Sequence, residues 1–89
     1  MPYYVYILVC KDGTFYTGYT RSVKTRLRLH RSGKGAKYLK THPPEKVVYV
    51  RKFETRSQAM KQERAIKRLT HAQKLKLTKI KSEKLLSVF

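Results

Sequence analysis

The stretch YYVYILVCKDGTFYTGYT, residues 3–20, places two apolar segments on either side of a turn sequence. Residues 3–10 are apolar on both alternating faces, which predicts a strand that is covered on both sides. The KDG sequence that follows suits a type I turn with glycine in the left-handed position after it. Residues 15–20 are then the returning strand of an antiparallel hairpin.

The length of the turn decides which side chains of this hairpin share a face. A two-residue loop would pair Tyr6 with Tyr19 and place Tyr6 and Tyr16 on opposite faces. A three-residue loop that ends in glycine would pair Tyr6 with Gly18 and place the two tyrosines on the same face. We predict the second register, because a glycine opposite Tyr6 explains why a residue that weakens strands is tolerated there.

Caps, breakers and alternating side chains predict the remaining elements. Ser22 caps one helix, and Thr55 with Gln58 forms a capping box that opens another. Two prolines in the basic segment that follows the first helix exclude a regular central strand there. The expected elements are a helix from residue 23 to Ser32-Gly33, a loop over 33–45, a strictly alternating strand over 46–53, helices over 56–69 and from 70 to about 81, and an apolar tail over 82–89.

These elements predict one small domain, residues 1–89, with its core over about residues 3–78. The fold class is α/β of the α+β kind, a three-stranded, mostly antiparallel sheet flanked by about three helices. The lone Cys10 excludes an intramolecular disulfide and is expected to be a buried thiol. Because the sequence has no apolar run of about 18 residues and no signal peptide, we expect a soluble cytoplasmic protein.

The charge of the chain indicates the kind of partner. There are 22 Lys and Arg against 5 Asp and Glu, which gives a net charge of +17. Such an excess repels itself in a compact protein and favours a polyanionic partner, with nucleic acid first and an anionic membrane second. A ribosomal RNA-binding protein would be equally basic, so charge alone does not identify a function.

Three polar residues lie on helix faces that are otherwise apolar. Glu63 is the only acid of its helix and falls inside the apolar stripe. It is either half of an i, i+4 pair with Lys67 or a carboxylate aimed into a cleft, where it would hold a hard cation. Arg26 and His30 lie on the helix face that should meet the sheet, where their stems would cover apolar surface unless they too belong to a site.

Together these residues resemble the GIY-YIG endonuclease superfamily. The first half of the motif corresponds to Tyr4-Val5-Tyr6 and the second to Tyr16-Thr17-Gly18, and an arginine and a later glutamate follow at matching spacings. The resemblance covers about residues 3–78 and is greatest to the small stand-alone bacterial members. Tyr4 replaces the first glycine of the motif and Thr17 its isoleucine, and neither change substitutes a reactive group.

The resemblance implies a set of catalytic residues. They are Tyr6, Tyr16, Arg26, His30 and Glu63, which we expect to converge on one cleft on the Tyr6 face of the sheet. Tyr6 is the expected general base, which requires cationic neighbours such as Arg26, His30 and a metal ion to favour its ionised form. Arg26 would stabilise developing charge, while Tyr16 and His30 would orient the phosphate or the water.

Glu63 is the expected metal ligand, because the other acids lie in a turn, beside the third strand or near the tail. One Mg²⁺ or Mn²⁺ ion, held by Glu63, water and the phosphate, is the simplest site. Gly18 would leave room for a nucleic-acid backbone. The expected phosphate contacts are Arg21, Arg28, Arg31, Lys34, Lys37, Lys40 and Lys67.

The sequence therefore predicts a divalent-metal-dependent endonuclease of the repair or recombination type, with DNA favoured over RNA. Two alternatives stay open: a non-catalytic DNA- or RNA-binding module of the same fold, and a ribosome- or RNA-associated structural protein. Neither a membrane nor an obligate protein partner is indicated. The structure of the substrate, the polarity of any cut and the oligomeric state do not follow from the sequence.

Overall fold

The computed structural model describes residues 2–86 and the side chains of residues 2–78. Three antiparallel strands form one sheet in the spatial order β2-β1-β3. The strands are β1 (Tyr3–Cys10), β2 (Phe15–Thr20) and β3 (Pro44–Phe53). The helices are α1 (Val23–Arg31), α2 (Tyr38–Thr41), α3 (Arg56–Lys67) and α4 (His71–Leu86). This architecture confirms the predicted fold class.

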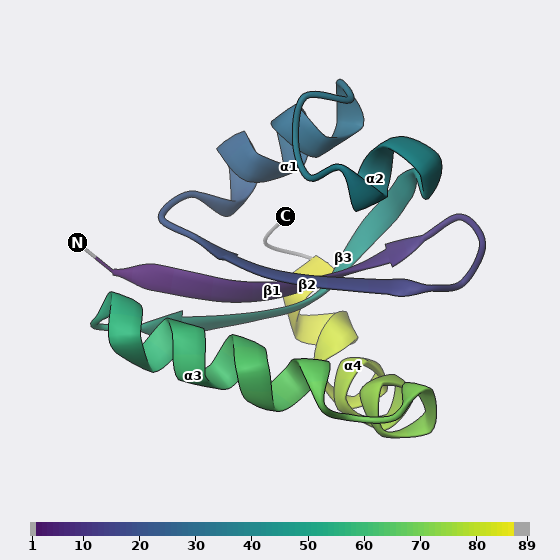
Figure 1. Cartoon of the computed structure of the whole chain (residues 1–89). Coiled ribbons are helices and arrows are strands. Elements are labelled where there is room, and N and C mark those ends of the chain that lie inside the picture. The colour runs from purple at the N-terminus through teal and green to yellow at the C-terminus, as the bar shows by residue number, and fades with distance from the viewer. Residues whose placement is uncertain (1, 87–89) are drawn as a thin grey trace.

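The sheet is covered on both faces, as the apolar sequence of β1 predicts. Figure 1 shows α1 and α2 over one face of the sheet, and α3 with the start of α4 over the other. Because β1 is the central strand, its consecutive residues from Val5 to Leu8 are all buried. Within the described residues, no helix has the length and apolar character needed to cross a membrane.

The hairpin has the predicted register. Tyr6 pairs with Gly18, and Leu8 pairs with Tyr16, so the two tyrosines lie on one face of the sheet. The loop is closed by the Cys10 N–H, which donates to the Thr14 carbonyl at 2.8 Å. Its last residue is a glycine with a φ of 85°, a conformation that other residues rarely adopt.

Several boundaries differ from the sequence prediction. Residues 38–41 form the short helix α2 instead of a loop, and β3 begins at Pro44 instead of residue 46. Proline is tolerated there because it is the first residue of an edge strand. The helix α3 ends two residues early, at Lys67, since Thr70 already caps the next helix. The helix α4 continues to Leu86, because no glycine or proline interrupts it, and residues 87–89 lie outside the described part.

The third strand does not alternate strictly. Ile7 pairs with Tyr49 and Leu8 pairs with Val47, which leaves Val48 as the extra residue of a β-bulge. The side chains of Val48 and Tyr49 therefore both join the cluster under α3. The prediction of strict alternation was wrong here, because a bulge changes the period locally.

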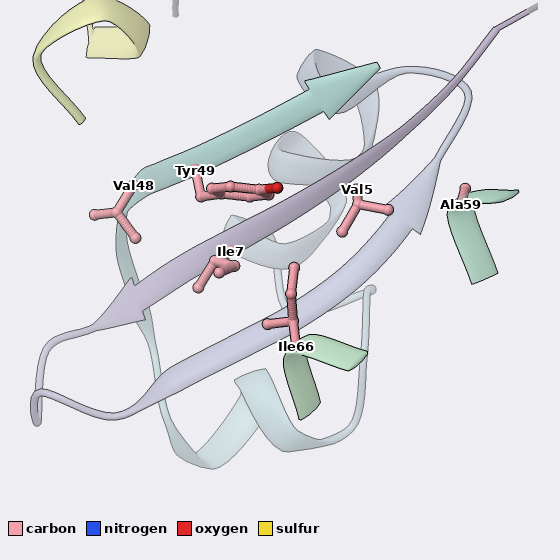
Figure 2. Close-up of a cluster of buried hydrophobic side chains, with 6 residues drawn as sticks. All are labelled: Val5, Ile7, Val48, Tyr49, Ala59 and Ile66. Atoms are coloured by element: carbon pink, nitrogen blue, oxygen red, sulfur yellow. The ribbon is translucent and has the colours of Figure 1, made fainter. Parts of the chain in front are cut away.

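The two faces of the sheet carry different cores. The face under α3 and α4 holds Val5, Ile7, Val48, Tyr49, Ala59 and Ile66. Figure 2 shows the Ile66 side chain pointing from its helix toward the strand residues Val5 and Ile7. The face under α1 and α2 holds Tyr6, Leu8, Cys10, Val23, Leu39 and Val47. Cys10 is buried there as predicted, and burial raises the pKa of its thiol.

Candidate active site

One open pocket of about 440 Å³ gathers all five of the predicted catalytic side chains. They come from β1, β2, α1 and α3, which are far apart in the sequence. The glycine of the second motif half and part of the segment before α2 complete the walls. The lining residues are Tyr6, Tyr16, Gly18, Tyr19, Arg26, His30, Lys34, Gly35, Ala36 and Glu63. We refer to it as the candidate pocket.

Gly18 is required by the position of the Tyr6 ring. A Cβ atom at residue 18 would lie 2.6 Å from the Tyr6 Oη and 2.8 Å from the ring carbon that bears it. The phenol therefore lies across the bare backbone of β2, and only 3 % of Tyr6 is exposed. This contact explains why a glycine is placed inside this strand.

His30 holds the hydroxyl of Tyr6 in place. The Tyr6 Oη and the His30 Nε2 are 2.9 Å apart, and only 2 % of His30 is exposed. The other ring nitrogen, Nδ1, accepts a hydrogen bond from the Ala36 backbone N–H at 3.2 Å. Because Nδ1 accepts, the neutral ring carries its proton on Nε2 and donates it to Tyr6. The phenolic proton of Tyr6 is then free to point to another acceptor.

The environment keeps His30 neutral. Burial lowers the pKa of His30, and the nearby positive charge of Arg26 lowers it further. The expectation that His30 would add positive charge to the site was therefore wrong. Its contribution is a directed N–H group.

The described residues also keep Tyr6 protonated. Burial raises the pKa of Tyr6 far above its usual value, and the charges of Tyr16 and Glu63 raise it as well, whereas Arg26 lowers it. Burial likewise raises the pKa of Tyr16, with Glu63 as a second cause and Arg26 opposing. Arg26 acts on Tyr6 in the expected direction, but burial outweighs it, so the described cations alone do not favour the ionised form.

Glu63 enters the pocket from the opposite side of the sheet. Its helix, α3, covers the face away from α1 (Figure 1). Its carboxylate nevertheless lines the candidate pocket, and 17 % of the side chain is exposed. The carboxylate oxygen Oε1 lies 3.8 Å from the Lys67 Nζ. Glu63 therefore pairs with Lys67, as the first interpretation of the sequence predicted, and also faces a pocket, as the second predicted.

The other predicted nucleic-acid contacts are spread over several surfaces. Gly18 and Lys34 line the candidate pocket. Lys67 does not line it but pairs with Glu63, which does. Arg28 and Arg31 line a separate hollow on α1. Elsewhere, Arg21 donates to the Tyr3 hydroxyl and stacks on its ring, while Lys37 and Lys40 are exposed in and before α2.

Sequence reasoning missed the role of Gly35 and Ala36. A Cβ atom at residue 35 would overlap the Nδ1 atom of His30, so the histidine ring packs directly on this backbone. The signal was present in the GKG sequence of residues 33–35. Gly33 has a φ of 78° after the end of α1, which accounts for the first glycine and leaves the second to be explained by a close contact.

Comparisons with known proteins identify relatives along nearly the whole chain. A model of the GIY-YIG catalytic domain matches residues 2–76. A UPF0213 protein of Oceanobacillus iheyensis is 47 % identical over 81 residues, which are 91 % of this chain and 94 % of the relative. A UPF0213 protein of Staphylococcus haemolyticus is 49 % identical over 75 residues, which are 84 % of this chain and 92 % of the relative.

Two solved structures have the same fold. The solution NMR structure of a UPF0213 protein from Bacillus halodurans is 44 % identical, with a TM-score of 0.59, and the match covers 92 % of this chain and 87 % of that one. The solution NMR structure of a protein from E. faecalis is 46 % identical, with a TM-score of 0.62. That match covers 90 % of this chain and 85 % of the other. These relatives are small proteins of similar length, as predicted for the stand-alone bacterial branch.

Proposed function

Because the chain belongs to the GIY-YIG family of nuclease domains, we propose that it is a divalent-metal-dependent endonuclease that hydrolyses phosphodiester bonds in DNA. One observation carries the proposal, the convergence of five polar side chains on a single open pocket. They are Tyr6, Tyr16, Arg26, His30 and Glu63. Membership of a nuclease family implies a nucleic-acid partner, and the net charge of +17 suits one.

The walls of the candidate pocket suit a phosphodiester. Arg26 and Lys34 contribute positive charge to its lining. Gly18 and Gly35 contribute backbone without side chains, so that a strand of nucleic acid can approach closely. Arg26 would then stabilise the negative charge that develops on the phosphate during hydrolysis.

Tyr6 and His30 would handle the proton of the attacking water. The His30 Nε2–H donates to the Tyr6 Oη and would stabilise a phenolate at that atom. The phenolate would accept a proton from the water as it attacks the phosphorus. Because burial raises the pKa of Tyr6, this role requires positive charge beyond that of the described residues.

Glu63 would hold a Mg²⁺ or Mn²⁺ ion. Among residues whose side chains the structure describes, no three His, Cys, Asp or Glu side chains are close enough to form a metal site together. Glu63 is the carboxylate in the candidate pocket, and this donor set fits an ion that keeps most of its water ligands. When bound, the ion would polarise the phosphate and supply positive charge near Tyr6.

A non-catalytic nucleic-acid-binding module is the second candidate. The observations that favour it are the raised pKa of Tyr6 and the single carboxylate in the pocket. Both candidates place nucleic acid across the candidate pocket. They differ in whether the bond is cut.

A nicking assay with and without Mg²⁺ distinguishes the candidates. Branched, flapped and single-stranded DNA are incubated with the wild type, with Glu63→Ala and with Glu54→Ala, which removes an exposed carboxylate near the end of β3. We expect cutting by the wild type and by Glu54→Ala in Mg²⁺, none by Glu63→Ala, and DNA binding by all three proteins. Binding of DNA without any metal-dependent cutting would favour the second candidate.

A further inference from the structure

A second pocket lies next to the candidate pocket, at the outer edge of the sheet. It has a volume of about 230 Å³ and is lined by Phe15, Tyr16, Thr17, Tyr38, Lys67 and Lys74. Tyr16 lines both pockets, so they are neighbours. We call it the edge pocket, because three of its residues belong to β2, an edge strand of the sheet. Its volume is below the roughly 300–1,000 Å³ of ordinary ligand pockets, which suits a group as small as one nucleobase.

A row of aromatic rings leads from the candidate pocket past the edge pocket. The ring centroids of Tyr6 and Tyr16 are 6.3 Å apart, and those of Tyr16 and Tyr38 are 6.1 Å apart with an interplanar angle of 26°. Tyr38 in turn stacks on His42 at 4.0 Å and 7°. The contact between Tyr16 and Tyr38 is therefore looser than the one between Tyr38 and His42, and both tyrosine rings line the edge pocket.

Tyr38 is a large aromatic residue that remains exposed to solvent. The neighbouring Leu39 fills the core with 3 % exposed, while 38 % of Tyr38 is exposed. The orientation of the Tyr38 ring is nevertheless defined, because it stacks on His42, whose Nε2 lies 3.9 Å from the Asp12 Oδ2 and whose Nδ1 lies 2.9 Å from the Thr41 hydroxyl. An exposed aromatic ring held in one orientation loses little conformational entropy when a flat partner stacks on it.

The charges around these rings suit a nucleic-acid strand. Lys67 and Lys74 line the edge pocket from α3 and α4. Lys37 and Lys40 are exposed on either side of Tyr38 in the sequence. Aromatic rings inside a basic groove are the usual means of binding single-stranded nucleic acid, because every base has a face that stacks.

We propose that Tyr16 and Tyr38 form a stacking site for an unpaired nucleobase of the DNA whose backbone occupies the candidate pocket. The inference rests on the proposed function and assigns its substrate class, DNA with single-stranded nucleotides beside the cleaved bond. Because Tyr16 lines both pockets, a base next to the bound phosphate can reach the edge pocket. In a continuous duplex the bases are stacked on one another, and exposing one costs free energy.

Equilibrium binding without divalent metal tests the stacking site. Fluorescent oligothymidylate and a blunt duplex of equal length are titrated at low salt with the wild type, Tyr38→Leu and Tyr38→Phe. We expect Tyr38→Leu to weaken binding of the single strand about tenfold and of the duplex less than about twofold, with Tyr38→Phe close to the wild type, as expected for base stacking. Circular dichroism establishes that each variant is folded.

The outcomes separate this inference from the proposed function. If Tyr38→Leu weakens both ligands equally, or neither, the stacking site is wrong. A wild type that cuts duplex in Mg²⁺ as fast as single-stranded or flapped DNA would also overturn the stacking site, while the proposed nuclease would stand. If the wild type binds neither ligand at low salt, the proposed function fails and the stacking site fails with it.

Discussion

The two faces of the sheet share the strand β1 but bury different kinds of side chain. Toward α3, the strand presents Val5 and Ile7, which pack on Ala59 and Ile66. Toward α1, it presents Tyr6, whose hydroxyl is hydrogen-bonded to a buried histidine. The first face contributes stability mainly through apolar burial, with a hydrogen bond from the Gln62 Nε2 to the Tyr49 hydroxyl. The second keeps polar groups in place beside an open pocket, which suggests that changes there affect chemistry more than folding.

The largest effect on stability is expected on the apolar face. Ile66 is 1 % exposed, so Ile66→Ala leaves a cavity and should lower the free energy of unfolding by about 2–5 kcal/mol. Cutting per folded molecule should change little, since the residue does not line the candidate pocket. Urea denaturation combined with the nicking assay measures both quantities. Loss of cutting in a protein that is still folded would contradict the division between the faces.

The next largest effect is expected at Gly18. Gly18→Ala places a methyl group against the Tyr6 hydroxyl and should move the phenol, which would reduce cutting about 100-fold. Gly33→Ala is a control for the added methyl group, because that group meets nothing within 4 Å, although the φ of 78° strains any other residue at this position. Rates normalised to the folded fraction compare the two. Equal rates would show that the close contact with Tyr6 is not needed.

A pH-dependent effect is expected from His30. Its pKa is lowered in the folded protein relative to the usual value of 6.5, so the unfolded chain binds a proton first as the pH falls. Stability should therefore be highest above about pH 6.5 and decrease below it. His30→Gln should show a smaller decrease over the same range in urea denaturation at several pH values. An unchanged slope would mean that His30 is not held neutral.

The smallest effect is expected from single surface charges. Lys34 lines the candidate pocket, whereas Lys52 is exposed on β3. Lys34→Ala should weaken binding to DNA of any sequence and reduce the slope of log affinity against log salt by about 1. Lys52→Ala should change neither the affinity nor the slope. Titrations at several salt concentrations measure the slopes. Identical slopes for the two variants would mean that the DNA does not cross the candidate pocket.

Local signals were sufficient to predict the hairpin and its register. The KDG sequence permits a three-residue loop with a glycine at positive φ, and the glycine that this loop places opposite Tyr6 favoured it over the two-residue loop. The helix starts were equally local, since Ser22 and Thr55 cap α1 and α3 as predicted. Chain segments whose structure depends on neighbouring residues could therefore be predicted well.

Features that depend on distant contacts could not be predicted. Helical periodicity placed Glu63 within the apolar stripe of α3, but it does not say which face of the sheet that helix covers. The tautomer of His30 depends on the Ala36 N–H, which a nonregular segment brings to the ring. The bulge at Val48 has no signal in the alternation of the strand. Each of these is set by tertiary packing.

The most direct test of the account is the rate of Mg²⁺-dependent cutting by Tyr6→Phe. This change removes one hydroxyl from the polar face and leaves the ring that lies across Gly18. We expect a folded protein that binds DNA like the wild type and cuts it at least about 100-fold more slowly, as expected for loss of a general base. Wild-type cutting by folded Tyr6→Phe would contradict the assignment of this face as the active site.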